Sequence, residues 1–468
     1  MTLRRPSSSA AVLAVLSVAQ FLIALDYSII YVALPSIASG LHIRPSLAQW
    51  IVSAYAILFA GFLVVGGRLS DRSGARRLFI ASVVIFGLAS ALGGAAPNGA
   101  VLLAARGAQG LGAALLQPAV LGLIGTTFPA GPERSRALAV WGSVGALGLA
   151  AGVVLGGLLT TVSWRLIFVV NVPLTLACAA GAAAWVSRNT ESAAGRRIPL
   201  LAAVLGTGSV LALVLGLTLS SDPGWTAPTT VASLVIAVVL FACFIRNEAV
   251  SGNVLINRVL RGTSSLRVGS AATALYMASV GSEFFLVTLL LQTTKGYSPL
   301  QAGLAFLPLA LMVTAGSTTA GRAVRVVRPA TVLAGGFAIA FAGLVWLAIT
   351  LQGGSYAADL LPGLLLSGFG HGTIYTSMFI VGTHDVAPSQ QGTAGGLLTT
   401  SQYLSGAIML AILTLALGSS PGTAQFRLSF VLIAAAAAGG LVLAVSRRRY
   451  SAVISMPAAP VAEPRGAA

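Results

Sequence analysis

The first apolar stretch of the chain contains one acidic residue, Asp26, in the run QFLIALDYSIIYVALP at residues 20–35. The stretch around it, about residues 10–38, is long enough to cross the roughly 30 Å hydrocarbon core of a bilayer. An acidic side chain at the centre of a membrane helix costs about 2.5 to 3.5 kcal/mol, so it is expected to face a protein interior or a wet cavity. We interpret Asp26 as a proton-coupling group of a transporter. The alternative is a structural Asp bonded to nearby backbone or hydroxyl groups.

Composition indicates that the elements around Asp26 are membrane helices. Hydrophobic residues make up 57% of the 468 residues, charged residues only 8%, and the mean hydropathy is +0.94. Soluble domains carry about 25% charged residues. The 54 glycines suit close helix packing in lipid, where small residues let backbones approach. The chain is therefore predicted to be an all-α integral membrane protein.

The remaining composition excludes several other classes of protein. The net charge of +17 comes from short cationic clusters between apolar runs, so no nucleic-acid partner is expected. Cys178 and Cys243 have no partner spacing, which indicates neither a disulfide framework nor a metal site. Three histidines without a paired motif argue against an enzyme. No cofactor is expected, and a proton is the predicted coupling ion.

The chain divides into fourteen apolar segments long enough to span a membrane. Their approximate ranges are 11–38, 47–67, 78–96, 99–124, 136–161, 165–187, 198–219, 228–245, 268–291, 300–320, 330–351, 357–381, 392–417 and 427–446. With this count, 22 of the 27 cations fall on one side, four on the other and Arg106 within a span. Because cytoplasmic loops are enriched in Lys and Arg, both termini are predicted to be cytoplasmic in a plasma or inner membrane.

The loop after the second segment, residues 67–77, reads GRLSDRSGARR. Its glycines, Gly67 and Gly74, permit a tight turn. The loop resembles the signature loop of the major facilitator superfamily. That resemblance implies a cytoplasmic gating network in which Asp71, Arg72 and Arg76 hold one conformation and release it during transport.

Two further motifs resemble the fourteen-helix drug/proton antiporter branch of that superfamily. The first is LDYSIIYVALP at residues 25–35, in which the resemblance implies proton coupling by Asp26. Tyr31 stands where the branch usually has Asn. The second is RGAQGLG at residues 106–112, which makes Arg106 a candidate partner in proton transfer. The alternative for Arg106 is a structural Arg that ties helices together.

The fifth segment contains a glycine-rich stretch that resembles the motif characteristic of exporters. Gly152, Gly156 and Gly157 would form a face for close helix contact. Val153 replaces the Pro of the branch, which removes the expected source of a kink. Segments 198–219 and 228–245 match the helix pair that this branch inserts between two six-helix halves.

Glu283 is the second carboxylate predicted to lie within the membrane. It could be a second proton site, the counter-ion of a cationic substrate, or a structural partner of another polar residue. His371 could titrate near neutrality, or it could be a hydrogen-bonded packing residue. A pocket that binds by apolar contact with few polar anchors is predicted from aromatic and amide side chains, which are Tyr27, Tyr31, Gln109, Gln117, Tyr276, Phe284 and Tyr375.

Together these features predict a major facilitator fold of two six-helix bundles plus two inserted helices. The expected parts are an N-terminal bundle at 1–190, the inserted pair at 191–248, a C-terminal bundle at 249–448 and a disordered cytoplasmic tail at 449–468. The resemblance implies a proton-coupled bacterial exporter of amphipathic small molecules, such as drugs, antibiotics or toxic metabolites, that works by alternating access. The alternative is a same-fold transporter with one narrow natural cargo, such as a self-made metabolite, a siderophore or a lipid. We expect a monomer in the lipid bilayer.

Overall fold

The computed structural model describes residues 9–43, 45–187, 199–220, 224–251, 254–351, 355–418 and 422–446. Within these residues, fourteen helical spans are long and apolar enough to cross a membrane, which confirms the predicted number. The N-terminal half contains α1 Ser9–Gly40, α2 Pro45–Ser73, α3 Ala75–Gly94, α4 Gly99–Thr127, α5 Pro132–Val162, α6 Leu166–Val169 and α7 Asn171–Trp185. The last two share the sixth span.

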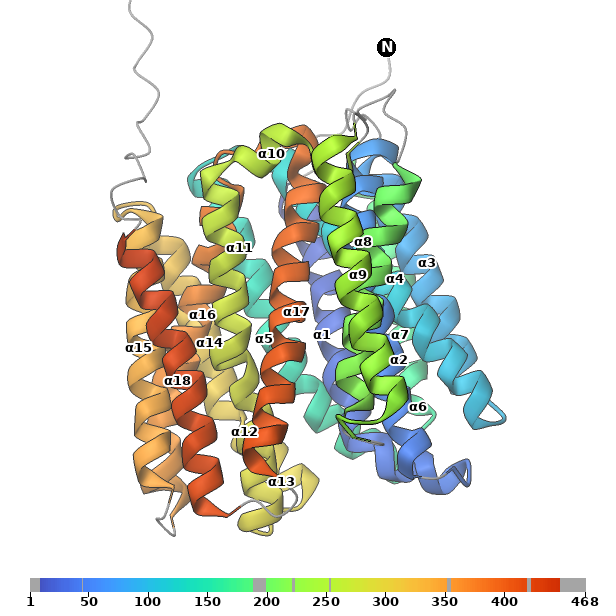
Figure 1. Ribbon diagram of the computed structural model, residues 1–468, viewed down its shortest axis with the longest axis vertical. Coiled ribbons are helices and arrows are strands. Elements are labelled where there is room, and N and C mark those ends of the chain that lie inside the picture. The colour runs from blue at the N-terminus through green and yellow to red at the C-terminus, as the bar shows by residue number, and fades with distance from the viewer. Residues whose placement is uncertain are drawn as a thin grey trace, which may run out of the picture.

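The two inserted helices follow as a hairpin beside the N-terminal half (Figure 1). They are α8 Leu200–Leu219 and α9 Pro228–Val250, and a short helix, α10 Arg258–Gly262, leads into the C-terminal half. On α2, Gly61 lies against Leu211 of α8; a Cβ added at Gly61 would meet a Leu211 methyl at 2.4 Å. The pair therefore packs on α2 through a small residue, as membrane helices commonly do.

The C-terminal half forms the second bundle (Figure 1). Its ninth span is interrupted, because α11 Ser264–Tyr276 and α12 Ser282–Leu289 alternate with π-helical turns at Met277–Gly281 and Leu290–Thr294. Such π-bulges are frequent at functional sites. The remaining helices are α13 Pro299–Ala305, α14 Leu307–Ala323, α15 Pro329–Thr350, a π-helical turn Tyr356–Leu360, α16 Leu361–Thr383, a 3₁₀ turn Pro388–Gln390, α17 Gln391–Leu417 and α18 Thr423–Ser446.

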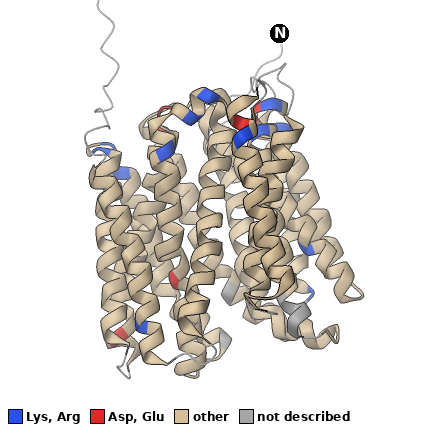
Figure 2. Cartoon of the chain, viewed as in Figure 1, with Lys and Arg blue, Asp and Glu red and all other residues tan. Residues whose placement is uncertain are grey.

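Charged residues gather at one end of the bundle. Helix α1 begins and α18 ends at this end, and Figure 2 shows most of the cations there. We call it the basic end and the other the opposite end. By their positions between or at the ends of helices, the described cations of the opposite end are Arg165, Lys295 and Arg427. Residues 191–198 of the predicted inserted pair (191–248) and the whole predicted tail (449–468) lie outside the described residues.

Candidate functional site

Asp26 lies in the middle of α1 and is 1% exposed. Its carboxylate accepts hydrogen bonds from three side chains. Arg106 Nη1 donates to Oδ2 at 2.8 Å, while Gln109 Nε2 and Asn171 Nδ2 donate to Oδ1 at 3.0 and 2.9 Å. Both carboxylate oxygens therefore have donors inside the protein. The structure brings Asp26 and Arg106 together as a buried ion pair.

Arg106 is also buried and has several interaction partners. Its side chain is 1% exposed, its Nε donates to the Ile51 carbonyl at 3.1 Å, and Nη1 also donates to Gln109 Oε1 at 2.9 Å. The guanidinium lies over the Tyr55 ring, 4.5 Å from its centroid. Taking two charges out of water is expensive, and the attraction between them compensates only when further hydrogen bonds complete the geometry. Those further bonds are present around both members of this pair.

Helix geometry explains how these groups meet. Arg106 and Gln109 are three residues apart on α4, so both side chains point to the same face, toward α1. Asn171 is the first residue of α7, and Ser90 on α3 accepts a hydrogen bond from Gln109 Nε2 at 2.8 Å. Four helices of the N-terminal half thus contribute to one polar cluster, the Asp26 cluster, made of Asp26, Ser90, Arg106, Gln109 and Asn171.

The glycine-rich face of α5 lies against α1 beside this cluster. A Cβ added at Gly152 would stand 2.0 Å from Ser28 Oγ and 2.7 Å from the Leu25 carbonyl. A Cβ at Gly156 would stand 3.1 Å from the Ile29 carbonyl. These two glycines therefore permit close packing of α5 on α1, next to Asp26.

The third glycine of this motif faces elsewhere. Gly157 lies against Leu300 of the C-terminal half, where a Cβ would be 3.1 Å from a Leu300 methyl. The backbone of α5 is one continuous helix across the motif. The side chain of Val153, which stands where the branch has Pro, lies outside the described residues.

Asp71, near the end of α2, binds the first turn of α17 in the opposite half. The Gly392 and Thr393 amides each donate to its carboxylate at 2.8 Å, and the Thr393 hydroxyl donates at 2.5 Å. A carboxylate is favourable there because a helix N-terminus has unpaired N–H groups and a partial positive charge. Gly67, one turn earlier on α2, lies under Gly392 and leaves no room for a side chain.

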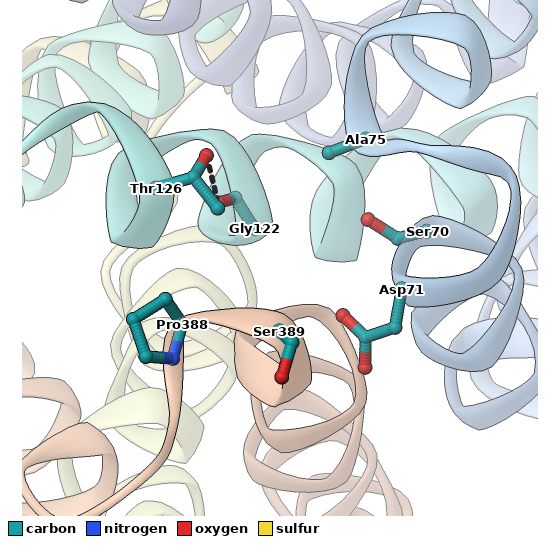
Figure 3. Close-up of a pocket in the computed structure, with 7 residues that line it drawn as sticks. All are labelled: Ser70, Asp71, Ala75, Gly122, Thr126, Pro388 and Ser389. Atoms are coloured by element: carbon teal, nitrogen blue, oxygen red, sulfur yellow. Dashed lines mark hydrogen bonds between the residues drawn. The ribbon is translucent and has the colours of Figure 1, made fainter. Parts of the chain in front are cut away.

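A small pocket at the basic end lies beside this contact (Figure 3). Ser70 and Asp71 of α2 line one side, Gly122 and Thr126 of α4 another, and Pro388 and Ser389 precede α17. The two halves of the molecule therefore meet here through a charged group and a helix end. The contact joins residues more than 300 positions apart in the sequence.

The two arginines predicted to act with Asp71 are placed differently in this conformation. Arg76 donates to the Ala182 and Ala183 carbonyls at 3.3 and 3.1 Å, which caps the C-terminal end of α7. Arg72 is exposed. Among the described residues, no ion pair joins Asp71 to either arginine. Gly74 has φ +88° between α2 and α3, a conformation that favours glycine.

Glu283 lies on α12 in the C-terminal half and is 1% exposed. Ser367 of α16 donates to its Oε1 at 2.6 Å, and Oε2 has no hydrogen-bond partner in the described structure. One turn along α16, His371 forms a hydrogen bond with the Tyr276 hydroxyl. The sequence left a structural role open for Glu283, and Ser367 is the partner found.

Aromatic side chains join the two halves near the middle of the bundle. Tyr375 of α16 stacks on Trp141 of α5 with ring centroids 5.5 Å apart, and Tyr276 lies 5.6 Å from Tyr375. In the N-terminal half, Tyr31 is 46% exposed and packs edge-on against Tyr27. These four tyrosines belong to the predicted pocket; Trp141 was not predicted.

The other predicted pocket residues are placed differently. Gln109 is wholly buried and belongs to the Asp26 cluster. Gln117 is 4% exposed and its Oε1 has no partner in the described structure. Phe284 packs on Phe306 with centroids 4.3 Å apart. The sequence analysis also missed Asn171 and Ser90 as members of the cluster; a polar residue inside an apolar span was the available signal for both.

Two bundles with an inserted helix pair and a buried charged cluster define a family of membrane transporters. A sequence profile described as Major Facilitator Superfamily matches residues 16–198 and 177–410. The chain therefore belongs to the major facilitator superfamily, which consists of transporters and not of enzymes.

The sequence is also similar to proteins named for antibiotic export or resistance, which agrees with the predicted drug-exporter branch. The cephamycin export protein CmcT of Amycolatopsis lactamdurans is 35% identical over 89% of this chain and 86% of its own. The puromycin resistance protein pur8 of Streptomyces alboniger is 35% identical over 86% of this chain and 80% of its own. The human organic anion transporter MFSD10 shares the fold, with TM-score 0.70, 16% identity, and coverage of 93% and 99% of the two chains.

The buried ion pair predicts non-additive losses of stability. Arg106→Gln and Asp26→Asn should each lower the free energy of unfolding by about 3 to 5 kcal/mol, because each leaves one buried charge uncompensated. The double variant should lose less than the two single losses combined, since it contains neither charge. Denaturation in mixed micelles measures all three. Fully additive losses would contradict the pairing.

The contact between Asp71 and α17 predicts a change in access at the basic end. In a protein with Cys178 and Cys243 replaced by Ser, Asp71→Asn should raise the labelling rate of Ser70→Cys by an impermeant maleimide several-fold. The reason is that a charge-assisted hydrogen bond is roughly twice as strong as a neutral one. Arg72→Gln, at an exposed neighbour, is the control and should leave the rate unchanged. Equal rates in all variants would show that Asp71 does not hold the contact.

Proposed function

We propose that this protein exports an amphipathic small molecule across a bacterial cell membrane in exchange for protons. The observation that carries the proposal is the Asp26–Arg106 pair, whose side chains are each 1% exposed within the membrane-spanning helices α1 and α4. Charged residues at such a depth mark ion pathways and proton relays. The named relatives that export or resist antibiotics support the direction of transport.

The proton would act by switching the charge of the Asp26 cluster. As an ion pair, Asp26 and Arg106 have no net charge. When Asp26 takes a proton, its attraction for Arg106 is lost, and the guanidinium must find other partners or water. A change of that size can favour a different arrangement of the helices. In this scheme Asp26 binds a proton while the protein is open to the outside and releases it to the cytoplasm.

The conformation described here is closed at the basic end. Asp71 binds the start of α17, and Ser317 of α14 donates to the Ala139 carbonyl of α5 at 3.0 Å. The cation distribution supports a cytoplasmic location for this end and for both termini, because cytoplasmic loops are enriched in Lys and Arg. Alternating access would then require that the contacts at this end separate when cargo enters from the cytoplasm.

The cargo would bind between the two halves. Tyr27 and Tyr31 of α1 and Tyr276 and Tyr375 of the C-terminal half offer apolar faces with single polar groups, which suits an amphipathic molecule. A second candidate function is export of one natural cargo. This second candidate is supported by relatives that are named for single antibiotics, including cephamycin, puromycin and lincomycin.

Proton flux in inverted vesicles tests the proposal. Cationic and neutral amphipathic compounds should release protons from energised vesicles that contain the wild type. Asp26→Asn should abolish the release, because an amide cannot carry the proton. Asp385→Asn, which removes an exposed carboxylate, is the control and should behave as the wild type.

A response to one compound alone would favour the narrow-cargo alternative. An unchanged response in Asp26→Asn would remove Asp26 from the coupling step. Proton exchange itself would be contradicted if no compound released protons while labelled compound was taken up at the same rate with and without a proton gradient.

A further inference from the structure

Asp26 and Glu283, two buried carboxylates of the membrane-spanning bundle, are held in opposite ways. Asp26 accepts three side-chain hydrogen bonds and pairs with a guanidinium. Glu283, equally buried, accepts one hydrogen bond from a neutral hydroxyl, and its Oε2 is without a partner in the described structure. The first carboxylate is compensated as an anion and the second is not.

The helices around Glu283 do not supply the missing charge. Helices α15, α16 and α17 contain no Lys, Arg, Asp or Glu, and Glu283 is the only such residue of α12. Arg267 lies at the basic end of α11, and Arg427 lies at the opposite end of α18. The titratable side chains on the neighbouring helices are Tyr276, His371, Tyr375 and Tyr403. An isolated ionised carboxylate in such surroundings is too costly, so the group takes up a proton.

Several polar side chains lie between Glu283 and the boundary between the halves. Ser367 and His371 are four residues apart on α16, so they lie on one face one turn from each other. Tyr276 lies seven residues before Glu283 and bonds to His371. The Tyr276 ring contacts Tyr375, which stacks on Trp141 of the N-terminal half. The hydroxyl and imidazole groups of these side chains can accept and donate protons.

We propose that Glu283 carries a second exchangeable proton, so that two protons enter for each cargo molecule exported, one on each half. This inference rests on the proposed proton exchange. In the present conformation Glu283 is a carboxylic acid. When the C-terminal half opens to the cytoplasm, the O–H bond breaks, the proton passes to water, and the electron pair remains on the carboxylate. A proton from outside restores the acid when that side opens.

The number of protons per cargo molecule tests the proposal. Purified protein in vesicles is given a fixed pH difference and no membrane potential, and the gradient of a neutral transported compound is measured at equilibrium. With two protons, the wild-type cargo gradient should equal the square of the proton gradient. Glu283→Gln should give a cargo gradient equal to the proton gradient itself. Glu283→Asp and Asp385→Asn should keep the wild-type value.

Each alternative outcome is distinct. An unchanged ratio in Glu283→Gln overturns the proposal, and if only cationic compounds then lose transport, Glu283 is a counter-ion for cargo. A wild type that builds no gradient contradicts the proposed function itself. Should Glu283→Gln fail to fold, infrared spectra of wild-type protein with carbon-13 glutamate provide a second test. A protonated glutamate band at neutral pH supports the proposal, and its absence overturns it.

Discussion

The ion pair between Asp26 and Arg106 is the interaction on which the N-terminal half depends. Each charge alone would be too costly at this depth, and each is acceptable only because the other lies 2.8 Å away. Both charges also require further partners on neighbouring helices. Gln109 and Asn171 complete the coordination of Asp26, and the Ile51 carbonyl and the Tyr55 ring complete that of Arg106. Gly152 of α5 permits the close packing that encloses the cluster. One buried charge thus constrains helices α1 to α5 and α7.

The contact between the two halves has a different physical character. Asp71 satisfies the free amides of one helix end, and aromatic rings stack near the middle of the bundle. Both contacts are local and near the surface of each half, so they can separate without unfolding either bundle. The Asp26 cluster, in contrast, lies within one bundle. The proposed alternating access needs such a division between strong contacts inside each half and contacts between the halves that can separate.

Much of the fold could be predicted from sequence because the relevant signals are local. Apolar length gives the fourteen spans. An acid and an arginine inside such spans must find compensation, which made Arg106 a candidate partner in proton transfer, and the structure shows that its counter-charge is Asp26. The partners of Asp71, Arg76 and Gly157 could not be predicted. Each depends on a helix far away in the chain, and the sequence contains no spacing that records such a contact. Asn171 is a polar residue inside the sixth span, but only the fold brings it to Asp26.

The partner of Glu283 could also not be predicted from the sequence. The sequence identified a buried acid but left open whether it is a second proton site, the counter-ion of a cationic substrate or a structural partner of another polar residue. The answer depends on what faces the carboxylate from neighbouring helices, and Ser367 is the hydrogen-bond partner found there. The missing signal was therefore the environment of the residue and not its position.

The most direct test of the central claim is infrared difference spectroscopy of protein with carbon-13 aspartate, recorded as cargo binds. The account predicts that cargo binding exchanges an ionised for a neutral carboxyl band, or the reverse, and that Asp26→Asn removes this change. A difference spectrum that is the same in the wild type and in Asp26→Asn would contradict the claim that this buried carboxylate couples protons to transport.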